Sequence, residues 1–437
     1  VHLGATSGSQ TGQWLRLPNN SLRTLAACGI AAAIAASFNT PLAGVIFSME
    51  VVMMEYSVIS FAPVILSAVT ATTLTRLVFG SERVFSIPAM QLGSLLELPY
   101  VIIMGVILGC IAALFIHLLQ RSTTLSKGWP IWVRCTLGGG IVGLIGMVVP
   151  EVMGIGYDTV NQALLGQLAL SVLLVITAAK VIASALCLGL GLPGGLIGPT
   201  IVIGALAGGA TGIIADTWLP GDIASPAFYA LIGMCTMMGA TLQAPLAALT
   251  AMLELTANPN IILPAMLALI AGVLVSREIF GKDSVYVILM KARGLDYRDS
   301  PLTQALRRIG VASVMERRYE SLPEVVDRAR MLEALASEPR WILITRDQQP
   351  LAIMPAADLA RQVQEHPEKE QCSLTDIPAE RIDISAIDFQ ATMQEAVSIL
   401  DNNNAEALYV TRNTIPGISR VYGVLTREDI DRSYRVN

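Results

Sequence analysis

The hydrophobic pattern divides the chain near residue 280. Before that point long apolar runs predominate, and several approach the roughly 20 residues that a helix needs to cross a bilayer. The runs are Leu22–Ser37, Pro41–Met54, Val58–Leu77, Leu98–Leu119, Trp132–Val149, Leu168–Leu190, Ile197–Ile214, Phe228–Leu255 and Ile261–Val275. Gly and Pro interrupt them repeatedly, and such breaks are tolerated in a membrane where the backbone lines a cavity. We therefore predict a mainly α protein, a polytopic helix bundle with a transport pathway.

After Asp283 the pattern changes to short alternating strands and charged helices. The predicted strands are Trp341–Thr345, Leu351–Ile353, Ala407–Thr411 and Val421–Leu425, and helices follow them over Ala356–Val363 and from Glu428 onward. Between the two sets, the acidic stretch His366–Cys372 reads as a solvated connector. This part is predicted to be a soluble α/β region of two similar modules, each of about 60 residues.

The distribution of charge supports this division. The first 280 residues hold 19 charged side chains and the last 157 hold 44, while the mean hydropathy of the whole chain is +0.60. Such a composition excludes an ordinary soluble enzyme, and no nucleophile or dinucleotide motif is present. The net charge of −5 without a basic run gives no reason to expect nucleic acid, and the three scattered histidines predict no metal.

An internal repeat strengthens the transport interpretation. The segment Phe38–Glu50 resembles Leu242–Glu254, with nine residues from proline to glutamate in both, and Gly29 matches Gly233 at the same offset of 204. Transporters are often built from inverted repeats that hold the substrate at the midplane. The alternative is that two apolar helices share small residues by chance. The repeat also leads us to expect the opening helices of its first copy upstream of Val1.

A candidate anion site lies in the loop Gly191–Pro199, directly before the apolar run Thr200–Ile214. Unpaired N–H groups and the positive end of the helix dipole meet at a helix N-terminus, which favours an anion. The loop holds no Lys or Arg, so binding would be weak enough for release, as conduction requires. The alternative to an anion site is that this loop is a Gly/Pro helix break that serves only the packing of the helices.

At these residues the chain resembles the ClC family of voltage-gated chloride channels and chloride/proton antiporters. Gly195-Leu196-Ile197-Gly198-Pro199 resembles the family's G-x-F-x-P anion loop, with Ile197 in place of Phe. The segments Phe38–Phe47 and Asp283–Tyr286 resemble two further family stretches, the second of which bears the anion-coordinating tyrosine. Two other family motifs, G-S-G-I-P and G-R-E-G-P, are not found, and Val1 aligns just after the second. Its gating glutamate is therefore expected upstream.

The resemblance implies a ClC inverted-repeat fold with an incomplete first repeat. It implies that the backbone amides of Leu196 and Ile197 and the hydroxyl of Tyr286 coordinate chloride. The anion loop also includes Gly194, Gly195, Gly198 and Pro199. Tyr286 could instead be an interfacial aromatic anchor.

The segment around Glu50 bears on the choice between channel and antiporter. Family antiporters usually carry a second acid directly after this glutamate, on the inner proton path, and here that position is Val51. Because valine cannot bind a proton, the resemblance favours a channel unless another acid such as Glu55 replaces it. Glu50 and its repeat mate Glu254 could equally be buried structural acids with backbone partners.

The soluble part resembles a pair of CBS modules. In the segment Gly423–Ile430, Thr426 and Asp429 match the positions that contact the phosphate and ribose of an adenine nucleotide. The alternative is that they form an N-terminal capping pair. In the first module Asp358 matches the second of these positions, but Pro355 stands where Thr or Ser is usual. ATP, ADP or AMP would be the ligand, and no cofactor is required for transport.

We predict a ClC transmembrane domain over residues 1–280, followed by a last short helix with a linker over 281–309. A first CBS module over 310–363, a connector over 364–372 and a second CBS module over 373–437 complete the predicted organisation. Passive chloride transport as a channel is the favoured function. Chloride/proton antiport is the alternative, and a non-transporting fragment acting through its nucleotide-sensing tail is the alternative of another class. The resemblance implies a homodimer in the inner membrane of a bacterium. Lys282 and Lys291 place the CBS modules in the cytoplasm.

Overall fold

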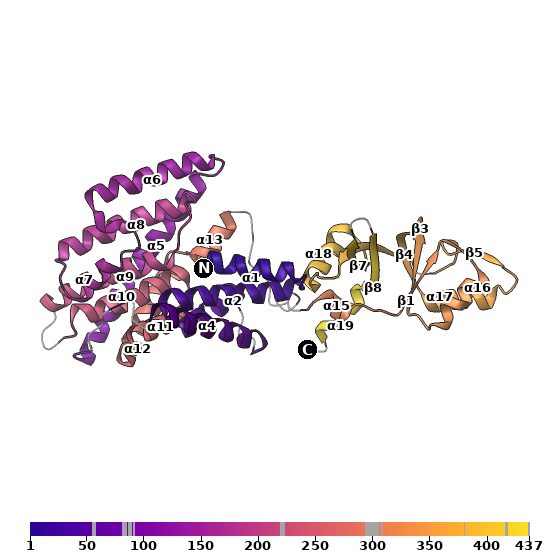
Figure 1. The fold of residues 1–437 in the computed structure, drawn as a ribbon, viewed down its shortest axis with the longest axis horizontal. Coiled ribbons are helices and arrows are strands. Elements are labelled where there is room, and N and C mark those ends of the chain that lie inside the picture. The colour runs from indigo at the N-terminus through magenta and orange to yellow at the C-terminus, as the bar shows by residue number, and fades with distance from the viewer. Residues whose placement is uncertain are drawn as a thin grey trace. The chain divides into compact units, whose positions relative to one another are not determined.

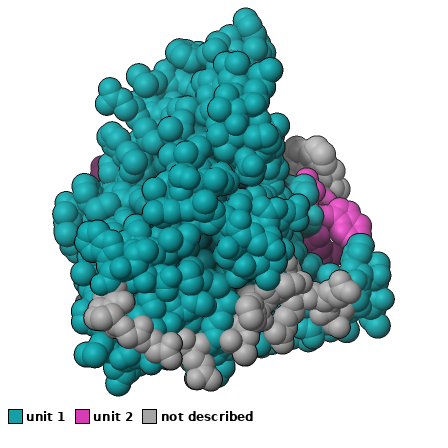
Figure 2. Space-filling model, turned by 90° about the vertical axis from the view of Figure 1, so that its left-hand side faces the viewer, with its two compact units in different colours: residues 1–9, 24–297 teal, residues 10–23, 298–437 magenta. Residues whose placement is uncertain are grey.

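The protein is seen in a computed structural model with two compact units. The structure describes residues 1–54, 58–80, 85, 90, 92–218, 223–292, 306, 309–379, 381–415 and 418–435, with the backbone alone for 58–59, 413–415, 418–419 and 433–435. Unit 1 comprises residues 1–9 and 24–297, and unit 2 comprises 10–23 and 298–437. Figure 2 colours the two units separately. Each unit is described by itself below.

Unit 1 is a bundle of helices, as predicted (Figure 1). In chain order the described helices up to residue 292 are α1 (His2–Trp14), α2 (Asn19–Phe38), α3 (Pro41–Phe47), η1 (Ser48–Met53), α4 (Val58–Phe79), η2 (Leu95–Glu97), α5 (Leu98–Leu125), α6 (Ile131–Val148), η3 (Pro150–Val152), α7 (Tyr157–Leu164), α8 (Leu170–Gly189), α9 (Ile197–Trp218), α10 (Pro226–Leu242), α11 (Pro245–Thr256), η4 (Pro259–Ile261), α12 (Ile262–Leu274), η5 (Val275–Ile279) and α13 (Val285–Ala292). The end of α1 and the start of α2 belong to unit 2. Within the described residues, seven helical stretches are long and apolar enough to cross a membrane.

The prediction of one continuous run over Phe228–Leu255 is wrong, because the structure divides it into α10 and α11. Gln243 takes a left-handed conformation with φ of 52°, and Pro245 opens α11 at a position that needs no N–H donor. The same break separates α2 from α3, where Asn39 has φ of 56° and Pro41 opens the helix. The backbone thus turns in the same way in both copies of the repeat.

Glycines at matching positions bring the helices of each repeat into close contact. A Cβ atom on Gly29 of α2 would lie 2.0 Å from the carbonyl oxygen of Gly4 in α1. A Cβ atom on Gly233 of α10 would lie 2.2 Å from the carbonyl oxygen of Gly204 in α9. Only glycine allows backbones to approach this closely. The structure therefore reproduces the repeat in its folding, and chance similarity does not explain it.

The centre and the periphery of unit 1 differ sharply in burial. Every residue of α10 from Ala227 to Leu242 is buried, whereas in α6 only Gly138 is buried. Large apolar side chains of α6, among them Leu144, Met147 and Val148, are exposed to between 67% and 82%. Exposed apolar faces of this size are expected where a helix meets lipid or a partner helix.

Unit 2 is an α/β region with one six-stranded sheet and one two-stranded sheet. Its described strands are β1 (Tyr319–Pro323), β2 (Val325–Asp327), β3 (Trp341–Arg346), β4 (Gln349–Pro355), β5 (Gln371–Ser373), β6 (Ile382–Asp388), β7 (Ala407–Ile415) and β8 (Ile418–Thr426). Its described helices are α15 (Val311–Val314), α16 (Arg328–Ala336), α17 (Ala356–Glu365), α18 (Met393–Asn403) and α19 (Arg427–Arg435). The predicted connector His366–Cys372 begins directly after α17, but its last two residues, Gln371 and Cys372, belong to strand β5.

The large sheet has the order β1-β3-β4-β6-β7-β8 and contains the same motif twice. In each half a parallel pair, β1 with β3 or β6 with β7, is followed by an antiparallel hairpin. The two halves join through β4 and β6, where Ile353 pairs with Ile382. The sheet edges also meet, since Glu316, just before β1, exchanges two backbone hydrogen bonds with Val424 of β8 at 2.8 and 3.0 Å.

Candidate functional site

The anion loop connects α8 to α9. Gly191, with φ of +87°, terminates α8 in a left-handed turn, and α9 begins at Ile197. Leu196 and Ile197 are 6% and 8% exposed, so the start of α9 is buried inside unit 1. The N–H groups in the first turn of a helix have no partner within that helix. The loop therefore has the buried helix N-terminus that the sequence predicts for an anion.

A small hollow lies beside Ile197. Its volume is about 20 Å³, enough for about one water molecule. Five helices and Thr40, the residue before α3, line this hollow. The lining residues from the helices are Ile34 and Phe38 of α2, Ala43 and Phe47 of α3, Ile197 and Ile201 of α9, Met238 of α10, and Ala247, Ala251 and Leu255 of α11. Both copies of the repeat thus contribute to a single space at the start of α9.

Tyr286 lies next to this hollow. Its ring packs edge-on against Phe47, with the ring centroids 6.1 Å apart and the planes at 79°. The start of α13 is fixed to the end of α10, because the Ser284 hydroxyl donates to the carbonyl oxygen of Leu242 at 2.7 Å. Phe47 thus contacts Tyr286 of α13 and lines the same hollow as Ile197 of α9. The structure brings the residues predicted for chloride into one region.

Glu50 lies in the π-helical turn η1, and its carboxylate is bound to backbone. The two carboxylate oxygens accept hydrogen bonds from the N–H groups of Leu246 and Ala247, at 3.2 and 2.7 Å. Val51 is half-buried and packs against the apolar core. Glu55, the other acid considered for a proton path, lies outside the described residues. The backbone partners expected of a structural acid are therefore observed for Glu50, although its side chain is half-buried and not buried.

The sequence analysis did not single out two buried charged residues, Lys180 and Glu97. The Lys180 ammonium of α8 is 2% exposed and donates to the carbonyl oxygens of Val152 and Gly154 at 2.8 and 3.0 Å. The Glu97 carboxylate is also 2% exposed and accepts from the Tyr229 hydroxyl at 2.5 Å. A single ionisable residue in an apolar run is the signal that could have marked both, because such residues are rare in membranes.

Comparison with known proteins identifies the family. The family model described as "Voltage gated chloride channel" matches residues 1–277. The chain belongs to this family. A ClcB-like chloride channel protein of Ralstonia nicotianae is 34% identical over 292 residues, which cover 65% of this chain and 68% of that protein. The H(+)/Cl(−) exchange transporter ClcA of Vibrio cholerae is 29% identical over 314 residues, covering 69% and 67%. The expected membership in the ClC family is confirmed.

Solved structures show the same fold. A slow cyanobacterial Cl⁻/H⁺ antiporter aligns with a TM-score of 0.59 and 24% identity, over 68% of this chain and 71% of that one. A eukaryotic CLC transporter aligns with a TM-score of 0.55 and 20% identity, over 93% of this chain and 70% of that one. The protein is thus a membrane-integral ClC-family transporter whose helices are followed in the sequence by a mixed α/β region, as predicted.

In unit 2, Thr426 and Asp429 form the capping pair that was the alternative to nucleotide binding. The Thr426 hydroxyl donates to the Asp429 carboxylate at 2.6 Å, and the Asp429 N–H donates to the Thr426 hydroxyl at 3.2 Å. Arg340 also pairs with Asp429, at 3.2 Å. Both residues are largely buried, so these contacts already occupy the polar groups that would face a ribose or phosphate.

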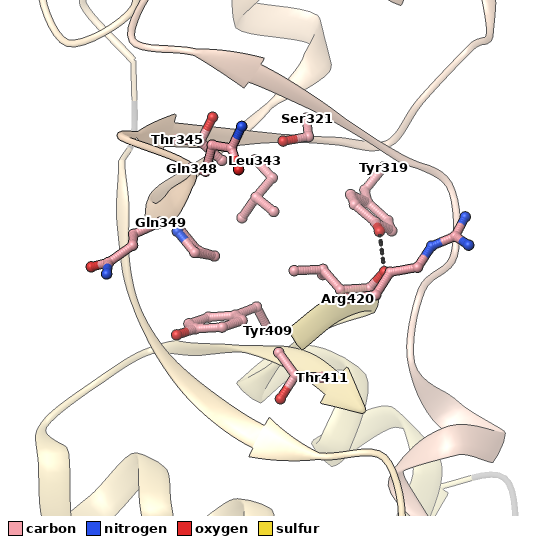
Figure 3. A pocket seen from close by; sticks show the side chains of 11 residues that line it. Tyr319, Ser321, Leu343, Thr345, Gln348, Gln349, Tyr409, Thr411 and Arg420 are labelled. Atoms are coloured by element: carbon pink, nitrogen blue, oxygen red, sulfur yellow. Dashed lines mark hydrogen bonds between the residues drawn. The ribbon is translucent and has the colours of Figure 1, made fainter. Parts of the chain in front are cut away.

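A cleft of unit 2 lies elsewhere, between strands of the two halves of the sheet. Its volume is about 560 Å³. The lining residues are Tyr319, Ser321, Leu343, Thr345, Gln348, Gln349, Pro350, Tyr409, Thr411, Arg420 and Val421. Figure 3 shows the rings of Tyr319 and Tyr409 on two sides of the cleft. None of the predicted nucleotide contacts lines it, and Asp358 instead pairs with Arg361 at 3.5 Å.

Tyr319 is held as a hydrogen-bond donor at the edge of this cleft. Its hydroxyl donates to the carbonyl oxygen of Val421 at 2.8 Å, which links β1 to β8 (Figure 3). Burial raises the pKa of the Tyr319 hydroxyl, so it stays protonated at neutral pH. The cleft offers two aromatic rings and several hydroxyls and amides, whereas the Arg420 guanidinium points away from it and lies 5.9 Å from the centre of the Tyr422 ring (Figure 3). Such a lining suits a flat, polar ligand.

Proposed function

We propose that this protein exchanges chloride for protons across the membrane. The observation that carries the proposal is the match to relatives named H(+)/Cl(−) exchange transporters, in several of which two thirds of the length is covered. The buried start of α9 at Ile197, with Tyr286 beside it across Phe47, supports chloride as the transported ion. Backbone N–H groups would hold the anion without a fixed cation in the loop, and this permits rapid release.

A chloride channel is the second candidate, because of Val51. This side chain packs against the apolar core and cannot take up a proton, so an exchanger needs a different acid on the inner side. The two candidates predict the same chloride site and differ only in whether protons move.

Chloride efflux from liposomes, recorded together with the external pH, separates the candidates. Proton movement in the direction opposite to chloride supports exchange, and chloride flux without proton movement supports the channel. Protein-free liposomes serve as the control that corrects for leakage. If neither ion moves, transport by this protein is disproved, and ligand binding by unit 2 should be tested next.

For unit 2 we propose a CBS pair on the cytoplasmic side that binds ATP, ADP or AMP. The cleft between Tyr319 and Tyr409 would hold the base better than the Thr426–Asp429 pair, because that pair already interacts with itself and with Arg340. By resemblance to the family, the protein would be a homodimer, with one pore in each subunit, in the inner membrane of a bacterium.

Equilibrium binding of the three nucleotides tests this second proposal. Tyr409→Ala should weaken binding about tenfold, since stacking on an aromatic ring contributes about 1–3 kcal/mol. Thr426→Ala should leave the affinity nearly unchanged if the cleft is the site. The reverse order of effects would return the site to Thr426 and Asp429.

A further inference from the structure

Glu50 and Glu254 form a reciprocal pair between α3 and α11. The carboxylate of Glu254 accepts hydrogen bonds from the N–H groups of Leu42 and Ala43 in the first turn of α3, at 2.9 and 2.7 Å. Glu50 makes the same two contacts, at 3.2 and 2.7 Å, with the first turn of α11. Each acid therefore caps the helix that belongs to the other copy of the repeat.

The chemistry of this pair is that of a helix cap. Pro41 and Pro245 open the two helices and have no N–H group, and the N–H groups that follow lack acceptors within their own helices. A carboxylate at this end also interacts favourably with the helix dipole. Because both oxygens of Glu50 and both of Glu254 are used, the four bonds fix the spacing and the relative rotation of α3 and α11.

The capped helices form much of the wall of the hollow beside Ile197. Ala43 and Phe47 come from α3, and Ala247, Ala251 and Leu255 come from α11. Phe47 also carries the contact to Tyr286. A change in the spacing of α3 and α11 would therefore alter the hollow and the environment of Tyr286 together.

We propose that Glu50 and Glu254 are matched positioning residues, which hold α3 and α11 at the separation that lets an anion pass the Ile197 hollow. The proposal rests on the anion transport proposed above and adds a residue assignment within it. Glu50 then acts as a fixed hydrogen-bond acceptor, and any proton that is exchanged moves on a different acid. The equivalence of Glu254 is the decisive point, since a proton carrier on the inner path would have no reason to be duplicated with the same bonds.

The test compares Glu50→Gln with Glu254→Gln in proteoliposomes. Each amide keeps one acceptor and turns an N–H donor toward a backbone N–H group, so each should slow chloride efflux about tenfold, the factor that corresponds to loss of a cap. We also expect both variants to shift the nitrate-to-chloride flux ratio in the same direction. The number of protons moved per chloride should stay that of the unmodified protein. Glu278→Gln is the matched control, because this acid is 66% exposed and its partner among the described residues is its neighbour Arg277.

Two results would overturn the proposal. In one, Glu50→Gln abolishes proton movement while Glu254→Gln does not, which would make Glu50 a proton carrier. In the other, both variants keep the original rate and flux ratio. If the unmodified protein moves chloride without protons, the exchange proposal fails, whereas the rate and the nitrate-to-chloride ratio still decide the role of the pair.

Hydrogen exchange of the unmodified protein gives a test that does not depend on the variants folding. The amides of Ala43 and Ala247 should exchange slowly and at similar rates, although they lie in first helical turns, where amides are normally unprotected. Rapid exchange of either amide in the folded protein would contradict the reciprocal cap.

Discussion

At the scale of single residues, the proposed chloride site combines groups that the sequence indicates with a neighbour, Phe47, whose contact the sequence does not indicate. The motif positions Leu196, Ile197 and Tyr286 follow from resemblance to the family, and in the structure Phe47 packs against Tyr286 and lines the same hollow as Ile197. Phe47 could not be predicted, since its role depends on a ring contact between segments about 240 residues apart. The bonds of Glu50 to Leu246 and Ala247 were equally inaccessible, because local sequence does not specify distant backbone donors.

Tyr286→Phe tests the hydroxyl without removing the ring. The contact with Phe47 should persist, so the stability of the folded protein should hardly change. Chloride affinity, measured by calorimetric titration, should fall at least about tenfold, because a hydrogen bond to a charged group contributes about 1.5–3 kcal/mol. Tyr100→Phe is the control, since its hydroxyl donates to the carbonyl oxygen of Thr211. Unchanged affinity in Tyr286→Phe would remove this hydroxyl from the site.

Ile197→Phe restores the residue that is usual in the family, in a space with little room for it. The hollow of about 20 Å³ cannot accept the larger ring without movement of Ile201 or Met238. We expect the free energy of unfolding to fall by about 1–3 kcal/mol through overpacking. Chloride should still bind, because the backbone donors are unchanged. Thermal unfolding with and without chloride checks both, and Ile197→Val serves as the smaller control.

Glu316 predicts how unit 2 responds to acid. Its hydrogen bond from Arg318 holds the pKa of the Glu316 carboxyl below its ordinary value, and Arg340 lies at 3.7 Å. The depressed pKa stabilises the folded state above the unfolded pKa of about 4.3, and this contribution is lost as the pH falls through the folded pKa. The amide of Val424, bonded to the Glu316 carbonyl oxygen, should therefore lose protection below about pH 4. Glu316→Gln should reduce this pH dependence, and an identical pH profile would contradict it.

At the scale of elements, close helix contacts depend on glycine. The α9–α10 contact brings Gly204 and Gly233 so near that neither tolerates a Cβ atom, and Gly4 and Gly29 repeat this between α1 and α2. The sequence showed Gly29 and Gly233 as a matched pair, but only the structure shows what each meets. Apolar runs and prolines were enough to predict most helices of unit 1. The apolar run Phe228–Leu255 did not reveal the break between α10 and α11, because hydrophobicity carries no information about a left-handed backbone such as that of Gln243.

Gly233→Ala should separate α9 from α10. A methyl group placed 2.2 Å from a backbone oxygen cannot be accommodated by a side-chain rotation, so the helices must move. We expect a loss of about 3 kcal/mol in the free energy of unfolding, at the upper end for overpacking. Gly139→Ala in α6 is the control, because its Cβ atom would meet nothing within 4 Å. Differential scanning calorimetry in detergent compares the two, and equal melting temperatures would contradict the close contact.

The strands of unit 2 were only partly predictable. Trp341–Arg346 is an apolar run that reads directly as a strand, whereas Tyr319–Pro323 contains a glutamate, a serine and a proline. This segment becomes β1 because β3 lies parallel to it and supplies its hydrogen-bond partners. The same holds for Ile382–Asp388, whose partner is β7. Parallel pairing joins distant segments, and a local pattern carries little information about it.

At the scale of the whole molecule, two compact units of different composition share one chain. The change in charge density near residue 280 predicted two parts, and the family match over residues 1–277 agrees with it. The clustering of contacts assigns residues up to 297 to unit 1 and adds 10–23 to unit 2. The inclusion of that early segment could not be predicted, since it depends on contacts rather than composition.

Two units should give two unfolding transitions, and different conditions should shift each of them. A ligand that binds only the folded state raises the melting temperature of the unit that binds it. Replacing gluconate by chloride should therefore raise the transition of unit 1 and leave that of unit 2 unchanged. Calorimetry in detergent tests this. One cooperative transition that moves as a whole with chloride would show that the units do not unfold independently.

The meeting of the sheet edges in unit 2 has a consequence for how the protein behaves at high concentration. An open sheet presents unpaired N–H and C=O groups to which strands of other chains can add, and this is a common route to aggregation. Here Glu316 and Val424 pair with each other, and the Tyr319 hydroxyl occupies the carbonyl oxygen of Val421. The backbone groups that make these bonds cannot pair with a foreign strand. Even when many copies crowd together in one bilayer, their tails should resist polymerising through sheet edges.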